Sequence, residues 1–242
     1  MNLVEKNREK NRKYIEKLQK MSDEELCAKF NCKPEQVCRG NYVAKLTRDK
    51  VCPFVVVLGY VNAAASQLQS LGDLEFIGLG DMGDGLDNEG LILSNSEIKD
   101  FGKVKRIYGD LMIDPANKYI KSFGEIEYIG GNCYLNRTTI KNMGKVKEVG
   151  GILSIDKSNV KSLQGLKKAG KIFAYEAYKL EDWGDTLEEV GDVEFSFLPL
   201  TQRRSDPANT LSIHSDFYKN FKRNASGVFE RKIAKSETNV DL

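Results

Sequence analysis

The sequence predicts a mainly β protein in which a repetitive solenoid follows a helical N-terminal region and precedes a basic C-terminal tail. Three observations lead to this expectation. The middle of the chain repeats every 20–22 residues, each unit carries apolar residues at fixed places, and each unit ends in a short segment of strictly alternating polarity. Apolar residues make up 40% of the 242-residue chain, which is typical of a folded globular protein.

The repeat defines the solenoid. Its first, fourth, seventh and tenth places are apolar, and a Gly or Gly-Gly pair precedes the alternating segment. A period this short leaves no room for two packed helices, so each unit is expected to form one coil that buries its apolar places against the next coil. The units begin at Leu68, Ile98, Ile120, Ile140, Val160 and Leu180. The pairs expected to point inward are Leu111/Ile113, Cys133/Leu135, Leu153/Ile155 and Phe173/Tyr175.

This pattern resembles leucine-rich repeats, most of all the receptor L-domain variety, over about residues 68–198. The resemblance implies a right-handed β-solenoid of about six short repeats and a non-enzymatic surface that binds proteins or other ligands. The chain departs from the common leucine-rich pattern at the place of the usual ladder asparagine. The residues near that place are Ser96, Thr138, Ser158 and Tyr178.

We expect three regions along the chain: a helical region over 1–50, the solenoid over 51–200, and a basic tail over 201–242. The β-branched run at 51–61 is expected to form a first, atypical coil that caps the array. The region 201–242 holds 8 basic and 5 acidic residues and is expected to be either a capping helix or a partly disordered extension.

Residues 22–39 resemble a helix-turn-helix, with a capping box at Ser22–Glu25 that starts the first helix. The residues that fit the expected order of apolar, small and turn positions are Leu26, Cys27, Phe30, Asn31, Cys32 and Val37. The resemblance implies that a second helix, opened by Pro34, offers Lys33, Gln36 and Arg39 to a nucleic-acid groove. The competing interpretation is a small helical cap on the solenoid.

Two rows of polar side chains are expected along the coils. The second place of the repeat carries Lys99, Lys121, Lys141 and Lys161, which form either a solvated face or a basic edge for an acidic partner or a phosphate backbone. The strand end carries Ser94, Asp114, Asn136, Asp156 and Glu176, beside the outward side chains Ile92, Met112, Tyr134, Ser154 and Ala174. Apolar and aromatic groups next to polar ones are typical of a protein-binding strip. The candidate protein-binding residues are Met112, Asp114, Tyr134, Asn136, Asp156 and Glu176.

The sequence offers little catalytic chemistry, and we expect no catalytic residue, no metal site and no cofactor. His214 is the one histidine. The GxGxxG match at Gly78–Gly83 is expected to lead into a strand rather than the helix that a dinucleotide site needs. Cysteines 27, 32, 38 and 52 lack the CxxC spacing of a zinc site. The acidic loop at 78–90 leaves calcium binding open.

The predicted function is therefore a non-enzymatic module that binds a protein partner through the solenoid face, as an adaptor or as an inhibitor or effector of a host machine. The alternative is a nucleic-acid-binding regulator that uses the segment at 22–39. An odd number of cysteines, no secretory signal and no apolar run of membrane-spanning length favour a cytoplasmic protein, and delivery into a host cell stays open. The sequence indicates neither the identity of the partner nor the oligomeric state.

Overall fold

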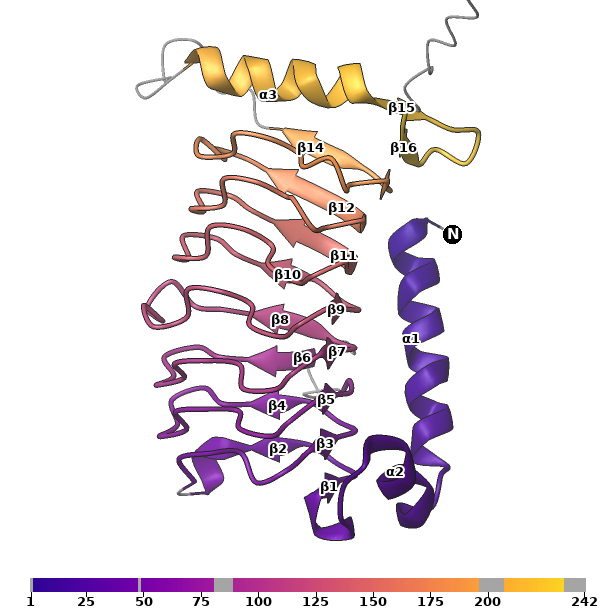
Figure 1. The fold of residues 1–242 in the computed structure, drawn as a ribbon, viewed down its shortest axis with the longest axis vertical. Coiled ribbons are helices and arrows are strands. Elements are labelled where there is room, and N and C mark those ends of the chain that lie inside the picture. Colours follow the sequence, from indigo (N-terminus) through magenta and orange to yellow (C-terminus); the bar gives the residue numbers. More distant parts are fainter. Residues whose placement is uncertain (1, 48, 81–88, 196–206, 233–242) are drawn as a thin grey trace, which may run out of the picture.

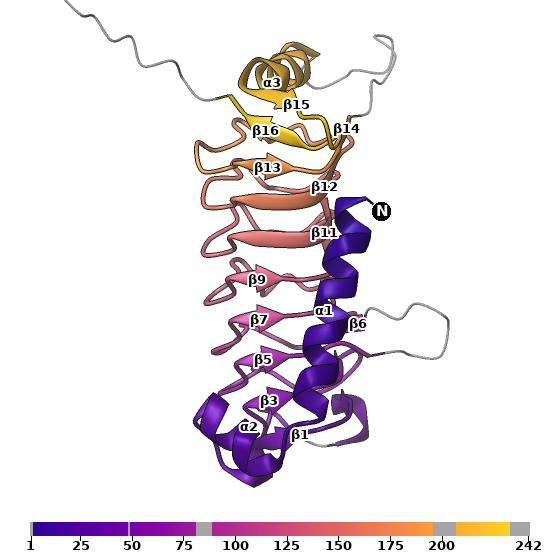
Figure 2. The same ribbon diagram turned by 90° about the vertical axis from the view of Figure 1, so that its right-hand side faces the viewer.

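The computed structural model describes residues 2–47, 49–80, 89–195 and 207–232, and Figure 1 shows a column of stacked coils. About eight turns of parallel β-solenoid make the column, which confirms the expected fold class and exceeds the expected six turns. Helix α1 (Leu3–Gln19) lies along one side of the column, and helix α3 (Pro207–Asn220) lies across its far end (Figures 1 and 2).

Most coils place one strand in each of two rows, and β11 and β12 are long enough to belong to both. The first row contains β1 (Val37–Cys38), β3 (Val56–Val57), β5 (Phe76–Ile77), β7 (Arg106–Ile107), β9 (Tyr128–Ile129), β11 (Glu148–Ser154), β12 (Lys168–Ala174) and β13 (Glu189–Val190). The second row contains β2 (Tyr42–Val43), β4 (Val61–Asn62), β6 (Glu89–Ile92), β8 (Asp110–Met112), β10 (Cys133–Tyr134), the ends of β11 and β12, and β14 (Val193–Phe195). Neighbouring strands within each row are parallel.

The apolar places of the repeat form the core, as the sequence predicts. The side chains at the first, fourth, seventh and tenth places are at most 2% exposed from Leu68 to Ala169. In the last unit, Leu180, Trp183, Leu187 and Val190 are buried to the same extent. Phe101 and Phe123 occupy the fourth place of successive units, and their rings stack with centroids 6.4 Å apart. The backbone is satisfied between coils, for example by the amide of Tyr108, which donates to the carbonyl of Ile77 at 2.9 Å. Because each coil's core is closed by its neighbours, the array is stable only when stacked.

The first coil begins at Val37, inside the region expected to be helical. After α2 (Asp23–Phe30), the expected second helix is a three-residue 3-10 turn, η1 (Pro34–Gln36), and the chain enters β1 immediately. A second short turn, η2 (Ala44–Leu46), follows β2. The helix prediction is wrong because Val37 and Cys38 pair with β3 and continue the sheet, which a helix from Pro34 would prevent. The solenoid therefore starts before residue 51.

Helix α1 is seated on a column of glycines at the corner between the two rows. The side-chain amide of Asn7 donates to the carbonyl of Gly150 at 2.9 Å, and that of Asn11 donates to the carbonyl of Gly130 at 3.0 Å. A helix rises about 5.4 Å per turn and strands lie about 4.8 Å apart, so one helical turn matches about one coil. Close stacking of the coils also requires glycine in this column, since a Cβ on Gly150 would lie 2.3 Å from the Gly130 oxygen.

The far end of the solenoid is closed by a cap rather than by an extension. Helix α3 leads into a hairpin of β15 (Phe221–Arg223) and β16 (Phe229–Arg231), and β16 pairs antiparallel with β13. Phe217 of α3 is fully buried, with its ring 4.9 Å from that of Trp183. Residues 207–232 thus cap the column, and residues 233–242 lie outside the described part.

Candidate binding surface

The outer side of the second row brings several of the expected binding residues into one line. Strand register places Ile92, Met112, Tyr134, Ser154 and Phe173 directly opposite one another on successive coils. Met112 is 37% exposed and Tyr134 is half-buried, whereas Ile92 and Ser154 are buried. We call this line, together with Tyr175 and Glu194, the outer strip.

The seventh coil is out of phase with the expected alternation by one residue. Ile172 and Ala174 are buried, whereas Phe173 and Tyr175 are partly exposed, so the inward pair Phe173/Tyr175 expected from the sequence is wrong. The cause is a register shift between Val149 and Ile152 in the β11–β12 pairing, where β12 has one glycine in place of Gly-Gly. Phe173 and Tyr175, which the sequence predicts to be in the core, therefore belong to the outer strip.

The same phase shift moves Glu176 out of the row in which the sequence placed it. Its φ of 51° matches Lys157 and Arg137, which occupy the left-handed position of the turns in preceding coils. The Glu176 carboxylate pairs with the Lys157 ammonium at 3.2 Å. Glu176 therefore belongs to the turn beside the outer strip, and Tyr175 takes the place next to Asp156.

At the C-terminal end of the strip, four side chains form a connected polar and aromatic cluster. The Lys171 ammonium lies 4.9 Å from the centroid of the Phe173 ring and pairs with Glu194, whose carboxylate also accepts a hydrogen bond from the Tyr175 hydroxyl. Hydrogen bonds from Lys171 and Tyr175 lower the pKa of Glu194, and the bond to Glu194 raises the pKa of Tyr175 to about 12. The cluster fixes the orientation of two partly exposed rings.

The other polar residues expected in the strip serve mainly to form turns. The Asp114 carboxylate accepts from the amide of Ala116 at 2.7 Å, and the Asp156 carboxylate accepts from the amide of Tyr175 at 2.8 Å. Burial raises the pKa of Asp156. The side-chain oxygen of Asn136 is buried, and no hydrogen-bond partner for it is found among the described residues. All three residues border the strip, and Asp114 and Asp156 hold its turns. Its exposed area comes from Met112, Tyr134, Phe173 and Tyr175.

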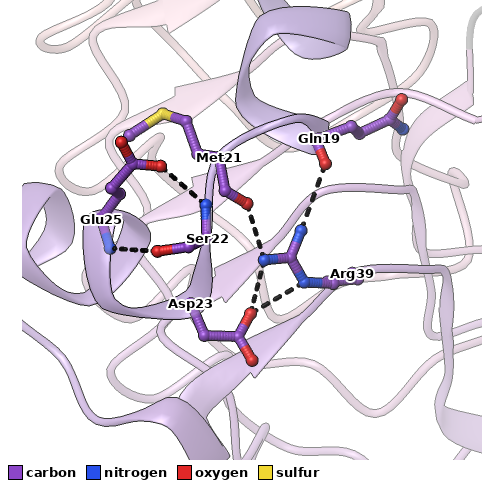
Figure 3. Close-up of polar contacts among 6 residues, drawn as sticks. All are labelled: Gln19, Met21, Ser22, Asp23, Glu25 and Arg39. Atoms are coloured by element: carbon purple, nitrogen blue, oxygen red, sulfur yellow. Dashed lines mark hydrogen bonds and ion pairs between the residues drawn. The ribbon is translucent and has the colours of Figure 1, made fainter.

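Gln36 and Arg39, which were expected to contact nucleic acid, instead make hydrogen bonds within the N-terminal region. The Gln36 side chain accepts a hydrogen bond from the Lys33 amide at 3.0 Å. Arg39 joins the two N-terminal helices, since its guanidinium donates to Asp23 and to the carbonyls of Gln19 and Met21 (Figure 3). Asn31 ends α2 with a φ of 51°, as the turn position requires, but no reading helix follows.

The four lysines at the second place of the repeat, Lys99, Lys121, Lys141 and Lys161, are all exposed. Lys161 pairs with Glu181 at 2.6 Å, and the Lys99 ammonium donates to the side chain of Gln69 at 3.2 Å. No ion pair is found for Lys121 or Lys141 in the described part of the chain. The row is therefore neutralised only at Lys161, and the amide that Lys99 contacts carries no counter-charge.

The first row carries charge of alternating sign, which suits a solvated face. Lys103 pairs with Asp73 at 2.7 Å, and Lys145 pairs with Glu125 at 2.6 Å. Two residues further along the chain, the ion pairs Lys105–Glu75 and Lys147–Glu127 also join neighbouring coils. A cavity of about 540 Å³ between α2 and this row is lined by these paired groups at Asp73, Glu75, Lys103 and Lys105. The described face offers few free charges to a ligand.

The other motifs mark structural positions. Gly78 is a glycine because a Cβ there would lie 1.8 Å from the carbonyl oxygen of Leu58. Asp81, Asp84 and Asp87 lie outside the described residues, whereas Glu89 is buried in β6. In the described ranges, no three His, Cys, Asp or Glu side chains gather as metal ligands would. The pKa of Cys32 is raised to about 11 by burial and by the adjacent Cys27.

Comparison with family models, with curated proteins and with solved structures finds no match for this chain. None of the described helices is both long enough and apolar enough to cross a membrane.

Proposed function

We propose that this protein is a non-enzymatic module that binds a protein partner through the outer strip. The observation that carries the proposal is the alignment of Met112, Tyr134, Phe173 and Tyr175 on one side of the second row, with polar residues at the border. Methionine and aromatic side chains are enriched at protein interfaces, tyrosine is among the residues that carry most of the binding energy, and a polar rim surrounds them.

The scaffold supports recognition with little loss of conformational freedom. Strands β6, β8, β10, β11 and β12 of the strip are paired with a strand on each side, and β14, which carries Glu194, pairs with β12. The rings near Glu194 are held by its hydrogen bond with Tyr175 and by Lys171. Because the surface is already ordered, binding loses less side-chain and backbone entropy than a flexible surface would. The likeness to leucine-rich repeats belongs to this proposal, since those repeats also present parallel strands to partners.

Two other classes, a nucleic-acid-binding regulator and an enzyme, have weaker support. The nucleic-acid alternative depends on a reading helix at 34–39, and that segment is a 3-10 turn followed by a strand. For an enzyme, His214 is the one imidazole, and its ring packs 4.7 Å from Phe195 and 4.9 Å from Tyr218. Burial lowers the pKa of His214. The proposed role is therefore that of an adaptor or of a stoichiometric inhibitor of the partner.

The test is quantitative capture of partners from a lysate of the native cell. The double variant Met112→Ala/Tyr134→Ala removes exposed area without touching the core, so we expect partner capture to fall by about tenfold or more. The control Lys145→Ala/Lys147→Ala removes two exposed cations from the first row and is expected to capture the partner normally. Equal capture by both variants would show that the outer strip is not the interface.

A further inference from the structure

We infer that a basic edge beside the outer strip binds an acidic segment of the protein partner. The basic edge is defined as Lys118, Lys121, Arg137 and Lys141. The inference rests on the proposed function, because it names the chemistry of the partner that the outer strip binds. The edge lies on the turns that follow β8 and β10, the strands that carry Met112 and Tyr134.

The basic edge differs from most other cations of the solenoid in having no counter-charge. Lysines on the first row pair with a carboxylate of a neighbouring coil, as do Lys157 and Lys161 in the segment between β11 and β12. In the described part of the chain, no carboxylate lies within ion-pair distance of any of the four edge cations, and all four are exposed. Segments 115–122 and 136–142 contain these four cations and no acidic residue.

Successive coils bring the four cations close together. Lys121 and Lys141 occupy the same place of adjacent units, and such places lie about 4.8 Å apart. The coils are joined at this point, since the Thr139 hydroxyl donates to the carbonyl of Ile120 at 2.7 Å. Like charges held this close repel one another, and a bound carboxylate would relieve the repulsion.

An insertion in the fourth coil adds an aromatic group to the edge. The coil of β7 and β8 is two residues longer than the next, and the extra loop is built on Asn117, whose buried amide donates to the Ser96 hydroxyl at 3.0 Å. The loop leaves Tyr119 60% exposed between Lys118 and Lys121. A tyrosine among cations gives a peptide both an apolar contact and a hydrogen-bond donor.

The extent of the edge favours a short acidic peptide over nucleic acid. Glu97 and Asp100 lie on the coil before it, and Glu181 and Asp182 lie beyond Lys161. A duplex-binding surface usually neutralises six to ten phosphates, roughly twice what four cations on adjacent coils can reach. The exposed side of α1 also carries cations, but Glu5, Glu9 and Glu16 alternate with them. The net charge of +2 gives the protein little long-range attraction for a polyanion.

A fluorescent peptide of about ten glutamates, which extends to at most about 35 Å, is the probe, and its anisotropy reports binding to the full chain at low salt. We expect the wild type to bind the peptide and the triple variant Lys121→Gln/Arg137→Gln/Lys141→Gln to bind it about tenfold more weakly. The control Lys103→Gln/Lys145→Gln/Lys147→Gln removes the same charge from paired positions and should bind within about twofold of wild type.

The inference is overturned if the wild type does not bind the peptide, or if the two triple variants bind it equally. It is also overturned if a thymidine decanucleotide binds the edge more tightly than the peptide, since nucleic acid would then be the better ligand. Met112→Ala/Tyr134→Ala should retain peptide binding. If that double variant captures the partner as well as wild type does, the proposed function is wrong, and the peptide result is unaffected. If the edge variant binds the peptide as well as wild type does, this inference is wrong, and the partner-capture result is unaffected.

Discussion

The side-chain amide of Asn11 donates a hydrogen bond of 3.0 Å to the carbonyl of Gly130, which joins the N-terminal helix to a coil 119 residues away. Asn11 is only 2% exposed, and its side-chain oxygen accepts a hydrogen bond of 2.7 Å from the Tyr128 hydroxyl. The helix is therefore part of the folded solenoid, anchored by a buried amide that uses both its donor and its acceptor.

Replacing that amide tests the seat of the helix. Asn11→Ala leaves the Gly130 carbonyl and the Tyr128 hydroxyl without their partner, so we expect the free energy of unfolding to fall by about 2 kcal/mol. Urea denaturation measures the change, and Lys13→Ala, at a side chain 72% exposed, is the matched control. A midpoint equal to that of the control would mean that α1 does not depend on this contact.

The glycine column should tolerate no side chain. A Cβ at Gly150 would lie 2.3 Å from the Gly130 oxygen, so Gly150→Ala must push two coils apart, and we expect a loss of about 3 kcal/mol. Nothing lies within 4 Å of a Cβ at Gly40, so Gly40→Ala serves as the control and should be close to neutral. Thermal unfolding compares the two, and equal melting temperatures would contradict the close stacking of the coils.

Arg39 is expected to matter for stability rather than for nucleic-acid binding. Its guanidinium donates to Asp23 and to two carbonyls at the junction of α1 and α2, so Arg39→Ala should lower the free energy of unfolding by about 1 kcal/mol. Lys33→Ala, at an exposed side chain, should leave it unchanged. Urea midpoints test both, and a duplex-binding defect in Arg39→Ala without any loss of stability would revive the helix-turn-helix interpretation.

The cluster at Glu194 predicts a pH-dependent contribution to stability. Because hydrogen bonds from Lys171 and Tyr175 lower the pKa of Glu194 in the folded state, its contribution is present above the ordinary glutamate pKa of about 4.3 and is lost as the pH falls through the lowered value. Wild type should therefore be more stable than Glu194→Gln at neutral pH, and the difference should shrink at acidic pH. Urea midpoints measured across that range would contradict the account if the difference were constant.

The core of the solenoid could be predicted from sequence because its signal is repeated. Leu68, Ile98 and Ile120 recur at one place of successive units, and a position that must be buried in every coil shows itself by periodicity alone. The first coil at 37–47 could not be found in this way, since it precedes the repeat and consists of two-residue strands. Its first strand is fixed by pairing with β3, which is a tertiary contact.

The outer strip was only partly predictable for a similar reason. Met112 and Tyr134 follow the regular phase, but Phe173 depends on a register shift that a single glycine introduces, and the sequence shows the shorter glycine run without showing its effect on phase. The seat of α1 was missed because its partners are backbone carbonyls, which no sequence pattern reveals. Lys118 and Arg137 lie outside the regular lysine row and became candidates only through their missing counter-charges.

The most direct test of the binding proposal is hydroxyl-radical footprinting of the full chain with and without its captured partner. Met112, Tyr134 and Phe173 should become protected in the complex, because an interface on the outer strip covers all three. Leu46 and Tyr218, exposed near the two ends of the column, should react as in the free protein. Protection at the ends with unchanged oxidation of Met112 and Tyr134 would contradict the proposed interface.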